Sequence, residues 1–115
     1  MAKLDEESEI RVWSIMQQAL KVVDASTDVE FTLFANFGET SETLPYLEEM
    51  KNVSLQAIST FSQLSILQLR IAEAQPIAST GILNMLAEAI AINQSRVPAW
   101  ERSIEEVKLE WNFYG

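Results

Sequence analysis

Residues 44–75 read LPYLEEMKNVSLQAISTFSQLSILQLRIAEAQ, and the fold of the whole chain depends on this stretch. Pro45 stands where proline is tolerated, in the first turn of a helix, and neither glycine nor proline recurs before Pro76. The stretch therefore predicts one continuous helix of about thirty residues, roughly 45 Å long at 1.5 Å per residue. We expect this central helix to be longer than any neighbour that covers it.

Apolar side chains follow two nearly opposite sides of the predicted central helix. The first stripe, with steps of three and four, contains Met50, Val53, Ala57, Phe61, Leu64, Leu67, Ile71 and Ala74. The second stripe contains Leu55, Ile58, Ile66 and Leu69, and small uncharged residues such as Ser62 lie between the stripes. Two apolar faces need two covers, so we expect an oligomeric helical interface, most simply a homodimer. The predicted interface residues are Leu55, Ile58, Ser62, Ile66 and Leu69.

The segment before the central helix predicts two shorter helices. Residues 6–24 have an amphipathic helical pattern, with Trp13 and Leu20 beside the apolar stripe. Thr27 and Glu30 have the spacing of a capping box, which favours a new helix over 28–37 that ends at Gly38. Alternating apolar residues over 29–37 also suit a strand, and periodicity alone leaves both readings open. We expect a helix, because a lone strand would have no partner in this chain.

The segment after the central helix also predicts two helices. Pro76 ends the central helix, a heavily buried helix follows over 77–95, and Pro98 opens the last one. In the last helix a narrow apolar stripe opposes an acidic face; the stripe consists of Trp100, Ile104, Val107 and Trp111. All three tryptophans are expected to pack in the core. The chain 1–115 is therefore predicted to be a single all-α domain, a four-to-five-helix bundle with a long central helix over 44–75.

Composition excludes many functions. The 115 residues contain 17 acidic and 8 basic side chains, a net charge of −9, and neither histidine nor cysteine. The negative charge argues against direct binding to nucleic acid, and the first ten residues lack the apolar core of a signal peptide. The uncharged run 52–69 holds too many hydroxyl and amide groups to span a membrane. A cytoplasmic protein without membrane contact is expected.

Catalytic and metal-binding motifs are incomplete. Without histidine or cysteine, and with isolated glycines, the usual nucleophile, base and phosphate-loop combinations cannot be assembled. Glu39 and Glu42 match the first half of the acidic motif of magnesium-dependent all-helical nucleotide pyrophosphatases, but the second half is missing. No catalytic residue, metal or cofactor is therefore expected.

Three functions are compatible with these observations. The favoured one is a non-enzymatic, acidic helical subunit for interaction, assembly or regulation, with a protein partner. The second is an acidic inhibitor or decoy of a basic nucleic-acid-binding protein, in which Glu48, Glu49 and the last helix stand in for phosphates. The third is a metal-dependent helical hydrolase that uses Glu39, Glu42, Glu48 or Glu49.

Overall fold

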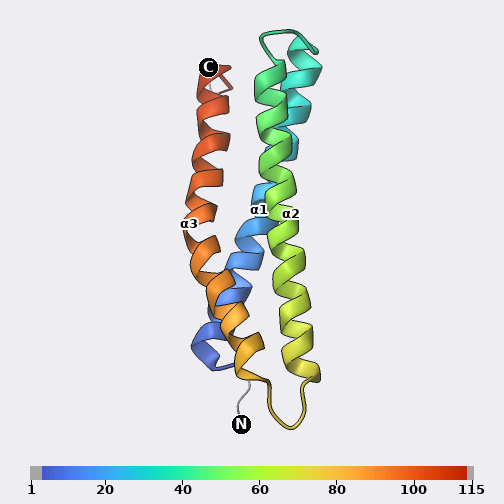
Figure 1. The fold of residues 1–115 in the computed structure, drawn as a ribbon. Coiled ribbons are helices and arrows are strands. Elements are labelled where there is room, and N and C mark those ends of the chain that lie inside the picture. The colour runs from blue at the N-terminus through green and yellow to red at the C-terminus, as the bar shows by residue number, and fades with distance from the viewer. Residues whose placement is uncertain (1–3, 114–115) are drawn as a thin grey trace.

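The computed structural model describes residues 4–113, which form three long α-helices. Helix α1 spans Glu6–Phe37, α2 spans Leu44–Glu73 and α3 spans Thr80–Glu110. Successive helices run in opposite directions and form an elongated bundle of 56 × 20 × 16 Å (Figure 1). The prediction of an all-α fold is confirmed. The predicted count of four to five helices is wrong. The two helices expected before α2 form one continuous helix, and so do the two expected after it.

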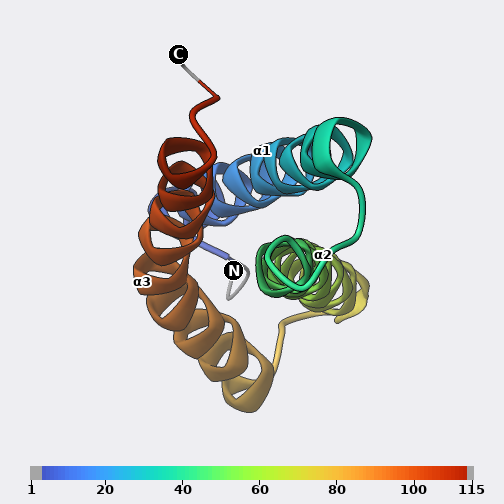
Figure 2. The same cartoon turned by 90° about the horizontal axis from the view of Figure 1, so that it is seen from above.

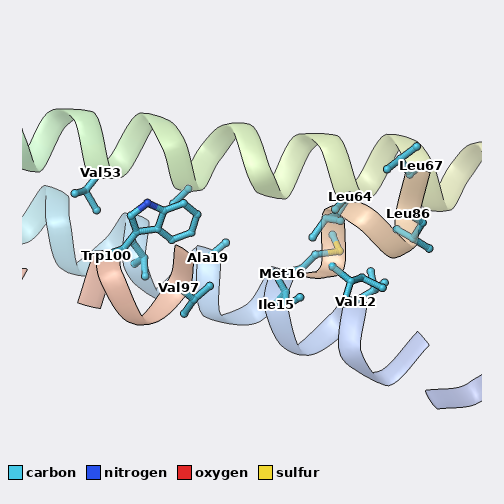
Figure 3. Close-up of a cluster of buried hydrophobic side chains, with 14 of the residues drawn as sticks. Val12, Ile15, Met16, Ala19, Val53, Leu64, Leu67, Leu86, Val97 and Trp100 are labelled. Carbon is cyan, nitrogen blue, oxygen red and sulfur yellow. The ribbon is translucent and has the colours of Figure 1, made fainter. Parts of the chain in front are cut away.

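The core is built from an unbroken heptad pattern in every helix. Buried residues recur at alternating steps of three and four, the spacing that keeps one face of a helix against its neighbours. In α1 they are Val12, Ile15, Ala19, Val22, Ser26, Val29 and Leu33; in α2, Met50, Val53, Ala57, Thr60, Leu64, Leu67 and Ile71; in α3, Leu86, Ile90, Asn93, Val97, Trp100, Ile104 and Val107. Side chains from all three helices meet along the axis of the bundle (Figure 3).

Helix α1 continues through the polar segment that suggested a break. Ser26 occupies a core position, and its hydroxyl donates a hydrogen bond of 2.7 Å to the carbonyl of Val22. Thr27 bonds back to the carbonyl of Val23 in the same way, also at 2.7 Å. The two hydroxyls are satisfied inside the helix, so the capping box predicted for Thr27 and Glu30 does not form. Residues 28–37 are helical, as expected, but they belong to α1.

Helix α3 continues through Pro98, where the sequence predicted a new helix. A proline inside a helix removes one backbone hydrogen bond and costs about 3 kcal/mol. The buried residues Val97 and Trp100 on either side of it continue the heptad pattern without a shift. Burial of these side chains outweighs the cost of the proline. Figure 2 shows that α3 curves around the other two helices.

The connections explain where the helices end. α1 stops before Gly38, whose φ of 72° lies in the left-handed region that favours glycine. Thr43 ties the first connection together: its hydroxyl donates to the carbonyl of Gly38 at 2.8 Å and accepts from the amide of Thr40 at 2.8 Å. α2 ends at Glu73, shortly before Pro76, as predicted. The three helices contain 32, 30 and 31 residues, so the central helix is not longer than its neighbours.

Candidate interaction interface

The predicted interface residues lie on the outer side of α2. The side chains opposite the core stripe remain exposed: Leu55 at 57%, Ile58 at 45%, Ile66 at 50% and Leu69 at 63%. Ser62, in the middle of this row, is also exposed. The first apolar stripe of α2 packs into the bundle core, from Met50 to Ile71. The chain itself therefore covers one of the two apolar faces of the central helix and leaves the second bare.

The exposed face of α2 is also free of charge. Charged side chains stop at Lys51 and resume at Arg70, a distance of about 28 Å along the helix. A solvated helix face normally carries charged residues, and neither of the other two helices has an uncharged run as long as residues 52–69. An uncharged row of exposed leucines and isoleucines is instead typical of a surface that is buried by association. We call Leu55, Ile58, Ser62, Ile66 and Leu69 the outer stripe.

Helix α1 adds apolar side chains beside the outer stripe. Trp13 and Leu69 line the same groove of about 550 Å³ between the start of α1 and the end of α2. A second groove, at the other end of this helix pair, is lined by Phe34, Leu44 and Leu47 together with four charged residues, which are Glu30, Glu39, Glu48 and Lys51. Phe31, the most exposed of these residues at 71%, lies one turn before Phe34. The apolar surface therefore extends from α2 onto α1.

On α1 the predicted apolar stripe is buried at Val12, Met16 and Ala19, but the large side chains beside it are not. Trp13, expected in the core, is 57% exposed, and Leu20 is exposed as well. Trp13 and Leu20 were predicted beside the buried stripe, whereas the core continues through Ser26 and Val29, and Phe31 is exposed. The buried side of α1 could have been identified by continuing the steps of three and four from Val12 through the polar Ser26 to Leu33.

The other two tryptophans lie where they were expected. Trp100 is buried, and its indole N–H donates a hydrogen bond of 2.8 Å to the side-chain oxygen of Gln56 on α2. Trp111 is half-buried between Phe37 and Tyr46, with ring centroids 4.9 and 5.6 Å away. These contacts join the C-terminal end of α3 to both other helices.

Of the helix predicted over 77–95, Leu86 and Ile90 are buried, but Met85 and Ile92 are about half exposed, so that helix is less buried than expected.

The acidic residues considered as ligands or phosphate mimics lie on the surface. Glu39 and Glu42 belong to the connection between α1 and α2, and Glu48 and Glu49 follow on the exposed side of the first turns of α2. Within residues 4–113, no group of three or more acidic, histidine or cysteine side chains could hold a metal ion. The acidic face of α3 is exposed, as predicted; it consists of Glu101, Glu105, Glu106 and Glu110.

The pKa of Tyr46 is raised above its usual value, first because the negative charge of Glu110 lies beside it. The Tyr46 hydroxyl also donates a hydrogen bond of 3.2 Å to the Glu110 carboxylate. This pair lies on the surface, away from the outer stripe, and links the start of α2 to the end of α3.

Helices within residues 4–113 all lack the combination of length and apolar character needed to span a membrane. Comparisons with protein-family models, with curated proteins and with solved structures gave no match.

Proposed function

We propose that this chain is a non-enzymatic assembly subunit that associates with itself through the outer stripe of α2. The observation that carries the proposal is the exposed, uncharged row of Leu55, Ile58, Ile66 and Leu69 on an otherwise acidic helical rod. A net charge of −9 makes two copies repel each other, and the uncharged stripe is the side from which a second copy approaches at the lowest electrostatic cost.

The size of the stripe sets the strength of association. Full burial of a leucine or isoleucine contributes about 1.5–3 kcal/mol, and these side chains are about half exposed, so each contributes roughly 1 kcal/mol. A symmetric pair buries eight of them, which gives roughly 8 kcal/mol against an association cost of about 4–15 kcal/mol. The stripe by itself exceeds the association cost only near the lower end of that range, which corresponds to a weak, concentration-dependent dimer. Exposed apolar residues on α1, such as Trp13, strengthen the dimer if the contact extends to them.

Light scattering over a wide range of protein concentration tests this function. We expect a shift from monomer to dimer as concentration rises. Leu69→Glu should keep the chain monomeric, because it buries a carboxylate in the apolar contact. Leu109→Glu is the matched control: Leu109 is 64% exposed on α3, outside the stripe, and its substitution should leave the dimer intact. A wild-type chain that stays monomeric at the highest concentration would overturn the proposal.

A further inference from the structure

The outer side of α2 reads the same in both directions from Ser62. Identical residues stand at equal distances before and after it; the pairs are Ser59 and Ser65, Ile58 and Ile66, Gln56 and Gln68, and Leu55 and Leu69. Each of these side chains is exposed or half-buried. The match fails at the positions between them, which are Ala57 and Leu67, Thr60 and Leu64, and Phe61 and Gln63. With the exception of Gln63, the residues that break the match pack into the chain's own bundle.

Such a symmetric row suits a two-fold axis. When two identical helices pack antiparallel around an axis through Ser62, each residue a given number of positions after it faces the residue the same number before it in the second copy. Leu55 then meets Leu69 of the second copy, and Ile58 meets Ile66. The five residues of the outer stripe lie within an arc of about 80° on the helix, so all of them reach the contact together. Ser62, the small residue at the centre, permits close approach of the two helices.

Charges at the two ends of the stripe select the same arrangement. Lys51 and Glu73 each lie eleven residues from Ser62, on the side of α2 that carries the stripe. In the antiparallel pair Lys51 of one copy therefore faces Glu73 of the other, twice by symmetry. In a parallel pair each of these residues would face its own copy, and like charges would repel. The side chain of Lys51 is 66% exposed and forms an ion pair of 3.7 Å with Glu30 of its own chain, so in the dimer Glu73 of the second copy shares or replaces this partner.

We infer that two copies of this chain associate by antiparallel packing of α2 on α2, with the two-fold axis at Ser62 and with Lys51 paired to Glu73 across the contact. This inference rests on the proposed function and specifies its partner, its register and its charge pairs. In this dimer the two-fold axis makes the two ends of the contact equivalent.

Single-cysteine variants test the register directly, because the chain contains no cysteine of its own. Ser62→Cys should form a disulfide-linked dimer under mild oxidation, since the two thiols lie on opposite sides of the axis. Leu55→Cys should not link to itself, because its two copies are about 21 Å apart along the helix and a disulfide requires Cα atoms within about 7 Å. A mixture of Leu55→Cys and Leu69→Cys chains should link to each other. Ser95→Cys on the exposed side of α3 controls for random collisions.

The outcomes separate the register from the function. If the wild-type chain dimerises but Leu55→Cys links to itself as readily as Ser62→Cys, the packing is parallel; the inference is then wrong and the assembly function stands. If Ser95→Cys links as fast as Ser62→Cys, the specific contact is absent and the inference is overturned. If the wild-type chain stays monomeric at all concentrations, both the antiparallel register and the proposed assembly function are wrong.

Charge reversal gives an independent readout. Lys51→Glu and Glu73→Lys should each raise the dimer dissociation constant by roughly tenfold, because each creates two like-charge contacts. The double variant Lys51→Glu/Glu73→Lys should restore it. If the double variant is no tighter than the single variants, the two residues do not face each other.

Discussion

The hydroxyl of Thr60 on α2 donates a hydrogen bond of 2.9 Å to the side-chain oxygen of Asn93 on α3, inside the core of the bundle. Each residue is 2% exposed. The amide nitrogen of Asn93 donates in turn to the carbonyl of Ala89 at 2.8 Å. An apolar contact tolerates a shift of one helix along another, whereas this pair is satisfied in one register only. The bond therefore fixes the alignment of α2 against α3.

Thr60→Val should destabilise the fold by about 1–3 kcal/mol, because it leaves the buried oxygen of Asn93 without a donor. Asn93→Leu should have a cost of similar size. The double variant Thr60→Val/Asn93→Leu should cost less than the sum of the two, since no polar group is left unpaired. Urea unfolding measures all three, with Ser95→Ala on the exposed side of α3 as a control that should change little. Additive costs would show that the two residues are not energetically coupled.

Pro98 offers a second test, since a proline inside a helix lacks the N–H that would bond to the carbonyl of Gln94. Pro98→Ala restores that donor at an exposed position and should stabilise the fold by about 1–2 kcal/mol, after allowing for the greater freedom of the unfolded chain. Ala99→Gly, at the next exposed position, should instead cost about 1 kcal/mol. Thermal unfolding followed by circular dichroism compares them. A loss of stability in Pro98→Ala would mean that the curve of α3 is needed to keep Trp100 in the core.

The contact between Tyr46 and Glu110 predicts a pH effect. The pKa of Tyr46 is raised from 10.0 by the adjacent carboxylate, so the neutral phenol is favoured in the folded chain. Its contribution to stability is complete below the unfolded pKa and is lost as the pH rises through the higher folded pKa. Glu110→Gln should lower the pKa of Tyr46 toward 10. Ultraviolet titration in a Tyr114→Phe background reports Tyr46 alone, and an unchanged titration in Glu110→Gln would contradict the pairing.

The central helix was predictable because its core stripe is apolar and continuous. The residues from Met50 to Ile71 fill six of seven heptad positions with apolar side chains, and Pro45 and Pro76 mark the two ends. Periodicity and proline then agree, so the helix over 44–75 was confirmed to within two residues at its end. The exposed outer stripe followed from the same pattern, although whether a second copy covers it remains a prediction.

The flanking helices were not predictable by the same rule, because polar and apolar residues exchange their usual places there. Ser26 and Asn93 occupy core positions and look like surface residues in the sequence, whereas Phe31 and Trp13 are exposed and look like core residues. Both buried polar side chains bond to carbonyls one turn earlier, a local solution that composition does not reveal. Pro98 suggested a boundary because its cost is local and visible, while the packing that offsets the cost comes from the other helices.

An odd number of antiparallel helices sends the two ends of the described chain out of opposite ends of the rod (Figure 1). The rod is 56 Å long and its three helices share one heptad core, so it resists bending more than a single helix would. Fluorophores or tethers attached at Leu4 and Phe113 would therefore be held far apart by the stiff helical rod. Single-molecule energy transfer between them should report a narrow distribution of long distances.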